Sequence, residues 1–353
     1  MHSDSYWLDT APAFTAAQTG DLPARVDVVV VGGGFTGLSA ARALAMKGAS
    51  VAVLEAGRVI GEASGRNGGH CSTGVAHDYA GLIASLGSER ARRYYQAYEN
   101  AVHSVVSLVE QERIACDLTR NGKLKLAAKA QHYDGLARTC ELIRREVDAE
   151  VELLSAEQVR SEVDSAQFHG GLLQRNGVQM HIGRFGIGLA EAAARHGALV
   201  YERTTMQGYR PEAGGYRVDT SRGSLQAGQV LMATGASQHG GLGWYRRRIV
   251  PVGSFIIATE RLPDAMLERL LPQRRSYVTS RIIGNYFRLT PDNRLLLGGR
   301  ARFAMSGGNS DLKSGKVLQA ALVQMFPQLA EAKIDYCWGC LLYTSDAADD
   351  LLC

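Results

Sequence analysis

Two apolar runs near the start of the chain flank an amphipathic segment. Residues 26–31 are almost all β-branched and apolar, which predicts a strand buried on both faces. Residues 36–47 place apolar side chains three and four positions apart, as on one face of a helix, and Gly48 follows them. Residues 50–54 are again apolar. The three segments predict a strand–helix–strand unit of an α/β fold.

The period of the pattern changes along the rest of the chain. Helical spacing predicts helices at residues 79–113, 131–147, 189–196 and 317–326. Alternating or short apolar runs predict strands at residues 123–127, 198–202, 216–220, 224–226, 229–233, 249–259, 277–279, 285–289 and 294–298. Residues 1–24 are expected to be a polar lead-in, and residues 170–188 an irregular, glycine-rich stretch. We therefore expect a doubly wound α/β domain whose insertions build a second domain around an antiparallel sheet.

A glycine-rich turn joins the first strand to the first helix. It reads Gly32, Gly33, Gly34, Phe35, Thr36, Gly37, and Glu55 ends the second strand. In such a unit the glycines allow a tight turn and a close backbone approach, so that a helix N-terminus can bind a pyrophosphate. Glu55 can accept hydrogen bonds from a ribose diol and would repel a 2′-phosphate. The unit predicts a bound dinucleotide with an unphosphorylated ribose; a glycine-rich loop without a ligand is the alternative.

Composition excludes several other classes of protein. The 353 residues, 46% hydrophobic and 21% charged, fit a globular protein of two domains. The net charge of +4 comes from scattered arginines, and the runs Arg246–Arg248 and Arg274–Arg275 lack interleaved aromatic residues, so no nucleic-acid partner is expected. No signal peptide and no apolar run of membrane-spanning length is visible, so we expect a cytoplasmic protein without a membrane partner.

The six cysteines do not form a recognisable site. Only Cys337 and Cys340 have a suggestive spacing, and they lack the second pair of a zinc ribbon and the context of a redox motif. We expect reduced thiols, with no metal site and no disulfide.

A second glycine-rich loop, residues 57–70, follows the second strand. It contains Ser64, Arg66 and Asn67 among several glycines, so it offers hydrogen-bond donors and bare backbone. This composition favours a loop that wraps a ligand longer than a nicotinamide dinucleotide. A flexible surface loop is the alternative.

Four short segments, taken in order, resemble one family. They are GGGFTG at residues 32–37, LEAGR at 54–58, ASGRNGG at 63–69 and ATG at 233–235. Together they resemble the FAD-dependent amine and amino-acid oxidase superfamily, which includes D-amino-acid, glycine and sarcosine oxidases. The resemblance implies FAD as the cofactor, held by Gly32, Gly33, Gly34, Phe35, Thr36, Gly37, Glu55, Ala56, Ser64, Arg66, Asn67, Gly68, Gly69, Met206, Thr234 and Gly235.

The same resemblance implies how the domains are arranged. The fold would be of the D-amino-acid oxidase and glutathione reductase type. A Rossmann-like FAD-binding domain would comprise residues 25–75 and 150–247. An inserted α+β substrate domain with an antiparallel sheet would comprise residues 76–149 and 248–335.

Further segments narrow the resemblance to a substrate class. SYW at residues 5–7, EASGRNGG at 62–69, PVGSFIIATERL at 251–262 and NYFRLTPDNRLLLGGR at 285–300 are similar to gamma-glutamylputrescine oxidases of putrescine catabolism. The similarity implies oxidative deamination of a small-molecule amine, with dioxygen as oxidant and with an aldehyde, ammonia and hydrogen peroxide as products. The alternatives are the same chemistry on glycine, sarcosine or another small amino acid, a nicotinamide-dependent dehydrogenase, and an inactive nucleotide-binding remnant.

Three residues are candidates for the substrate pocket. His70 follows the second glycine-rich loop, and Tyr286 and Arg288 lie two apart on one predicted strand, so they share a sheet face. An arginine fork could bind a substrate carboxylate. The alternatives are a structural histidine and a solvent-facing arginine. Arg300 and Trp338 are further candidates, and the sequence assigns neither an oligomeric state nor a covalent flavin link.

The last residues depart from the family pattern. The resemblance implies another strand and a glycine-rich turn into a final helix beside the flavin, whereas residues 341–353 read LLYTSDAADDLLC. We expect a non-native tail on a truncated chain in which the C-terminal part of the FAD domain is missing and FAD binds weakly. A short divergent tail is the alternative.

Overall fold

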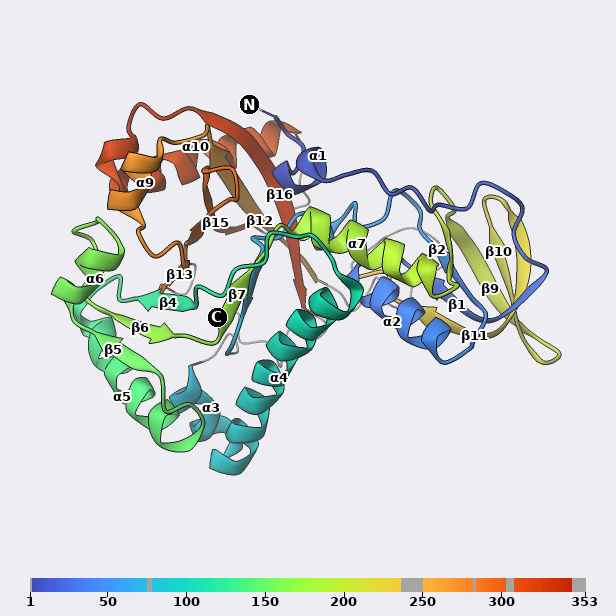
Figure 1. Ribbon diagram of the computed structural model, residues 1–353, viewed down its shortest axis with the longest axis horizontal. Coiled ribbons are helices and arrows are strands. Elements are labelled where there is room, and N and C mark those ends of the chain that lie inside the picture. Colours follow the sequence, from blue (N-terminus) through green and yellow to red (C-terminus); the bar gives the residue numbers. More distant parts are fainter. Residues whose placement is uncertain (1, 75–77, 236–249, 282–283, 303–307, 345–353) are drawn as a thin grey trace.

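Two β-sheets organise the chain, one of six strands and one of eight (Figure 1). The computed structural model describes residues 2–74, 78–235, 250–281, 284–302 and 308–344. A small third sheet pairs β3 (His70–Ser72) with β7 (Gly177–Gln179). The α/β organisation expected from the sequence is confirmed.

The six-stranded sheet has the order β8-β2-β1-β11-β10-β9. Its three parallel pairings run from β8 through β2 and β1 to β11, and the β10–β9 hairpin adds an antiparallel edge. The strands are β1 (Arg25–Val31), β2 (Val51–Leu54), β8 (Leu199–Tyr201), β9 (Met206–Glu212), β10 (Gly215–Thr220) and β11 (Gly223–Met232). The strands predicted at residues 224–226 and 229–233 are therefore a single strand.

Two helices cover one face of this sheet. Helices α2 (Phe35–Met46) and α7 (Ile182–Arg195) lie side by side in Figure 1, and their apolar side chains share a core with Val28 and Val30 of β1. The opposite face of β1 contributes Val29 to a second core with residues of β8 to β11. Because both faces of β1 are covered, its near-continuous valine run is explained, and the predicted strand–helix–strand unit is confirmed.

The eight-stranded sheet has the order β16-β12-β15-β14-β13-β4-β6-β5. Its pairings are antiparallel except that β4 and β13 are parallel. The strands are β4 (Lys123–Leu126), β5 (Glu152–Leu154), β6 (Gly171–Gln174), β12 (Val250–Thr259), β13 (Ser276–Thr279), β14 (Tyr286–Leu289), β15 (Leu295–Arg302) and β16 (Ile334–Thr344).

The two faces of this large sheet differ in chemistry. One face carries leucine and aromatic side chains such as Leu124 and Phe287, which pack with α9 (Asp264–Leu270) and α10 (Gly308–Met325). Side chains alternate along a strand, and the register pairs Val278 with both Lys125 and Tyr286. Lys123, Lys125, Tyr286 and Arg288 therefore share the other face. We call this the polar face.

Further helices pack near the edge of this sheet that β6 and β5 form. They are α3 (Tyr79–Leu86), α4 (Ser88–Glu112), α5 (Ala130–Glu146) and α6 (Ala156–Glu162). The single helix predicted at residues 79–113 is wrong, because Gly87 at φ +78° ends α3 and α4 starts anew. Two 3₁₀ turns, η1 (Ala63–Gly65) and η2 (Pro327–Leu329), complete the described elements.

Two sequence predictions for irregular stretches are wrong. Residues 170–188 contain β6, β7 and the first half of α7, because their helical glycines are packing positions rather than breakers. A Cβ at Gly183 would overlap Trp7 O, and Cβ atoms at Gly186 and Gly188 would meet Ile60 and Ile114. Residues 1–24 contain α1 (Tyr6–Thr10), in which Trp7 is fully buried.

Some expectations are left as predictions. The domain boundaries stay predictions. Within the segment 150–247 that was assigned to the FAD-binding domain, β5 and β6 pair in the large sheet and not in the six-stranded one. The first four residues of the expected tail extend β16 to Thr344, which pairs with Val250 of β12. Residues 345–353 and Arg246–Arg248 lie outside the described residues.

Several absences hold for the described residues alone. No helix there is long and apolar enough to cross a membrane. No group of three metal-ligating side chains occurs in that part of the chain. Cys71, Cys116 and Cys140 are free thiols.

Glu112 joins three helices that cover the six-stranded sheet. Its carboxylate accepts hydrogen bonds from Arg42 of α2 (2.6 Å) and Arg195 of α7 (2.9 Å), and lies 2.9 Å from His196 Nε2. The side chain is only 7% exposed. Burial alone would raise the pKa of Glu112, but the hydrogen bonds from His196 and Arg42 outweigh it and lower the pKa from 4.5 to about 2.

We predict that Glu112→Gln destabilises the fold in a pH-dependent way. A lowered pKa in the folded state stabilises above pH 4.5, and this stabilisation is lost as the pH falls toward 2. The free energy of unfolding, measured by urea denaturation, should fall by about 3 kcal/mol at pH 7, with the difference shrinking in acid. Glu89→Gln, which removes an exposed pair with Arg93, is the control. A pH-independent difference would contradict the assignment.

Candidate functional site

The glycine-rich turn after β1 is closed by backbone packing. Gly32 has φ +110°, a Cβ there would overlap Ala233 O, and a Cβ at Gly37 would overlap Gly32 O. The backbone of the turn is therefore bare where α2 begins at Phe35. A bare turn at a helix N-terminus fits the pyrophosphate of a dinucleotide.

Glu55 lies across this turn. Its Oε2 accepts a hydrogen bond from Gly33 N (2.7 Å), and its Oε1 accepts one from Gly57 N (2.7 Å). Each carboxylate oxygen keeps a second lone pair, so both could still accept a ribose hydroxyl. The carboxylate thus lies beside the glycine-rich turn, and its role as a ribose ligand stays a prediction.

The second glycine-rich loop is tied to the start of α2 and to itself. Ser64 Oγ accepts a hydrogen bond from Phe35 N (3.0 Å). Asn67 donates to Ala63 O and Ser64 O and accepts from Gly69 N (2.9 Å). The Asn67 side chain therefore shapes the loop instead of projecting from it.

The other predicted FAD contacts have mixed environments. Arg66 Nε donates to Gly339 O (2.7 Å), and Met206 is buried in the core beneath the six-stranded sheet. Thr234 and Gly235 follow β11. Ala233, which precedes them, packs against Gly32. Thr36 and Ala56 are exposed, and Gly68 and Gly69 line the approach to the polar face.

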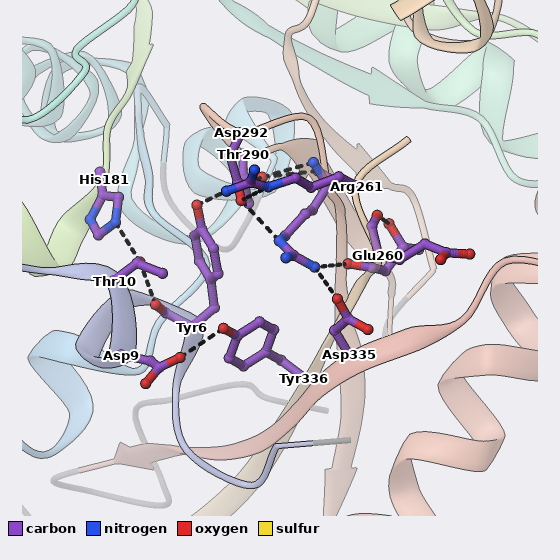
Figure 2. Close-up of polar contacts among 12 residues, drawn as sticks. Tyr6, Asp9, Thr10, His181, Glu260, Arg261, Thr290, Asp292, Asp335 and Tyr336 are labelled. Carbon is purple, nitrogen blue, oxygen red and sulfur yellow. Dashed lines mark hydrogen bonds and ion pairs between the residues drawn. The ribbon is translucent and has the colours of Figure 1, made fainter. Parts of the chain in front are cut away.

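Helix α1 closes one side of this region. Trp7 Nε1 donates to Asn67 O (2.8 Å), and Ser5 Oγ donates to Gly65 O (2.7 Å). Figure 2 shows how α1 is anchored: Tyr6 donates to Asp292 (2.6 Å), and Tyr336 donates to Asp9 (2.7 Å). This helix was not predicted, because residues 1–24 were expected to be a polar lead-in.

Arg288 is a buried cation without an ion-pair partner. It is 2% exposed, and it donates through Nη1 to Gly69 O (2.6 Å) and Met180 O (3.0 Å) and through Nε to Leu289 O (3.1 Å). Among the described residues no carboxylate forms an ion pair with it. Burial lowers the pKa of Arg288 to about 9. Because an uncompensated buried charge is costly, this position would attract an anion.

His70 and Tyr286 stand next to Arg288. Their rings meet edge-on with centroids 5.5 Å apart, and a Cβ at Gly68 would lie 2.7 Å from Tyr286 Cε2. Burial, with the charges of Arg288 and Lys123, lowers the pKa of His70 to about 3, so the imidazole is neutral at pH 7. Burial raises the pKa of Tyr286, which keeps its phenol protonated. His70 Nε2 is buried without a hydrogen-bond partner.

The structure thus brings His70, Tyr286 and Arg288 together at the Gly68–Gly69 turn. Trp338, a further candidate, is fully buried and donates to Arg66 O (2.8 Å), which is a structural contact. The Arg300 side chain lies outside the described residues. The roles of all these residues stay predictions.

Sequence reasoning missed Lys123. Its Nζ donates to Thr73 O (2.7 Å), and burial, followed by the charge of Lys125, lowers its pKa to about 8. The alternating sequence KLKL of β4 places both lysines on the polar face. That alternation was the available signal, but it does not show which lysine becomes buried.

Three comparisons with known proteins agree with this geometry. Residues 27–351 match the family described as DAO, FAD dependent oxidoreductase. The chain is 33% identical over 345 residues to the gamma-glutamylputrescine oxidoreductase of Escherichia coli, covering 96% of this chain and 78% of that one. It is 30% identical over 352 residues to a probable oxidoreductase, OrdL, of Haemophilus influenzae, again covering 96% and 78%.

A solved structure shares the fold. The crystal structure of glycine oxidase from Geobacillus kaustophilus matches with a TM-score of 0.73 at 22% identity, over 92% of this chain and 84% of that one. At this identity the match shows the fold alone. It agrees with the arrangement of one sheet for the nucleotide and a second, larger sheet.

We predict that Gly34→Ala weakens FAD binding. The new methyl group would lie 2.9 Å from Ser64 Oγ, which must move away from Phe35 N and disturb the first turn of α2. The Kd, measured by quenching of flavin fluorescence, should rise about tenfold. Gly135→Ala in α5, where a Cβ meets nothing within 4 Å, is the control. Equal affinities for the two variants would contradict the assigned cradle.

Proposed function

The chain belongs to the FAD dependent oxidoreductase family, and we propose on that premise that it oxidises gamma-glutamylputrescine. Membership makes it an FAD-dependent enzyme that acts on amines or amino acids. The substrate within that class is the proposal. It rests chiefly on the similarity to the Escherichia coli enzyme, which extends over 96% of this chain and so includes both sheets.

The residues present fit the cofactor. We propose that the turn at residues 32–37 holds the FAD pyrophosphate, that Glu55 holds the ribose, and that residues 63–69 and 233–235 contribute further contacts. The packing at Gly32, Gly34 and Gly37 supports this cradle, since side chains there would meet neighbouring atoms. His70, Tyr286 and Arg288 are proposed to line the substrate pocket beside Gly69.

The proposed reaction converts the primary amine of the substrate to an aldehyde. The bound flavin supplies acceptance of a hydride from the amine-bearing carbon and transfer of two electrons to dioxygen, which yields hydrogen peroxide. Water then adds to the resulting imine, and ammonia leaves. The protein binds and orients the amine, and a neutral His70 does not add a positive charge that would repel it.

Charge in the pocket supports a substrate that carries a carboxylate. Arg288 is buried, and no carboxylate in the described part of the chain pairs with it. After burial, its charge and that of Lys123 lower the pKa of His70. Gamma-glutamylputrescine has a carboxylate, whereas free putrescine has two ammonium groups and no anion. The pocket should therefore discriminate against putrescine.

A small amino acid such as glycine or sarcosine is the second candidate. The buried guanidinium of Arg288 lies at Gly69, beside the loop proposed to run along the cofactor. There it could bind a carboxylate attached directly to the reacting carbon. The fold shared with glycine oxidase is consistent with this candidate but carries no substrate information.

The proposed reactants are the small-molecule amine and dioxygen. A cytoplasmic location and the absence of nucleic-acid and membrane partners stay predictions from the sequence. No oligomeric state is proposed.

Peroxide release from a panel of amines tests the substrate proposal. With FAD added, gamma-glutamylputrescine should give a kcat/KM about a hundredfold above that of putrescine, because putrescine leaves a buried cation unpaired. Glycine, sarcosine and D-alanine should react more slowly still. Turnover of the small amino acids alone would reject gamma-glutamylputrescine and favour the second candidate.

A further inference from the structure

Lys123 is a second cation on the polar face, half-buried, and it contacts the same chain segment as Arg288 but four residues further along. Arg288 binds Gly69 O, and Lys123 Nζ binds Thr73 O (2.7 Å). Gly74, next along this segment, would place a Cβ 3.5 Å from Lys123 Nζ. Arg288 and Lys123 therefore contact the residues that flank β3 on its two sides, Gly69 and Thr73.

The surroundings leave the charge of Lys123 uncompensated. No carboxylate among the described residues forms an ion pair with it, and the charge that acts on it is the like charge of Lys125. Lys125 differs, because the charge of Asp78 acts favourably on it. Burial of an ammonium group without an anion destabilises its charged form, which is why the pKa of Lys123 falls to about 8.

Unpartnered acceptors occur close to Lys123. Ser276 is its register partner in β13, and Ser276 Oγ is buried without a hydrogen bond. Gln179 donates its amide nitrogen to Arg274 O, two residues before Ser276, while its buried Oε1 has no partner. Buried polar atoms in native proteins are nearly always hydrogen-bonded, so these atoms point to a ligand or bound water.

We propose that Lys123, Ser276 and Gln179 form a subsite for an α-amino-acid headgroup remote from the reacting amine. The Lys123 ammonium binds the headgroup carboxylate, and the oxygens of Ser276 and Gln179 accept from its ammonium. This inference rests on the proposed function, since the glutamyl end of gamma-glutamylputrescine is such a headgroup. The glutamyl carboxylate then lies at Lys123, while Arg288 lines the pocket beside Gly69 and holds the loop through its hydrogen bond to Gly69 O.

The length of the segment fits such a substrate. Gly69 and Thr73 are four positions apart, and extended chain of that length spans at most roughly 13 Å. In extended gamma-glutamylputrescine, the reacting carbon and the carboxylate carbon are separated by roughly 11 Å at ordinary bond lengths. In glycine these two carbons are bonded to each other. Glycine therefore cannot use Lys123 while reacting near Gly69.

Lys123→Met tests the subsite, with Lys125→Met as the matched control on the same strand and face. For gamma-glutamylputrescine, K123M should raise KM at least about tenfold and leave kcat within about twofold, since the lost contact is remote from the reacting carbon. For putrescine, which has no headgroup, K123M should change neither constant. K125M should leave both substrates unaffected.

A substrate analogue tests the same contact on the wild-type protein. The α-carboxylate methyl ester of gamma-glutamylputrescine should have a KM raised by a similar factor in the wild type, and K123M should raise it no further. Lys123→Arg, which retains the charge, should restore most of the affinity for the unmodified substrate.

The outcomes separate the two proposals. If the wild type does not oxidise gamma-glutamylputrescine, the proposed function fails, and the subsite fails with it. If the wild type oxidises it but K123M weakens both substrates equally, or the ester binds normally, the subsite alone is rejected and Lys123 is structural.

Discussion

The buried guanidinium of Arg288 is the interaction on which the rest of the site depends. Arg288 projects from the large sheet and donates hydrogen bonds to the carbonyls of Gly69 and Met180. These bonds hold the second glycine-rich loop against the polar face. Trp7 covers the same guanidinium, with 5.4 Å between its ring and the arginine carbon, and also donates to Asn67 O. One cation thereby positions the second glycine-rich loop, the N-terminal helix and the polar face relative to one another.

Local pattern was enough to predict the nucleotide half of the fold. The valine run of β1, the helical spacing of α2 and the turn between them depend on neighbouring residues, and the structure has them where expected. The start of α7 was missed because glycine was read as a helix breaker. Gly183 is there because Trp7 O packs against it, and a sequence pattern does not show a contact between residues so far apart.

The site was predictable to a similar extent. His70, Tyr286 and Arg288 were candidates from a motif and a two-residue spacing, and the structure brings them together. The polar groups of Asn67 instead hold its own loop. Lys123 was not foreseen, because its burial and its missing counter-charge arise from the packing of β3 and β13 against β4, which no local pattern encodes.

We propose that an amine bound beside Gly69 reduces a flavin held by the glycine-rich turn. The most direct measurement is the visible absorbance of the FAD-loaded protein under anaerobic conditions, before and after addition of gamma-glutamylputrescine. The account predicts that the oxidised-flavin absorbance is bleached by the substrate and returns on admission of air. Absorbance that gamma-glutamylputrescine leaves unchanged, while dithionite still bleaches it, would contradict the account.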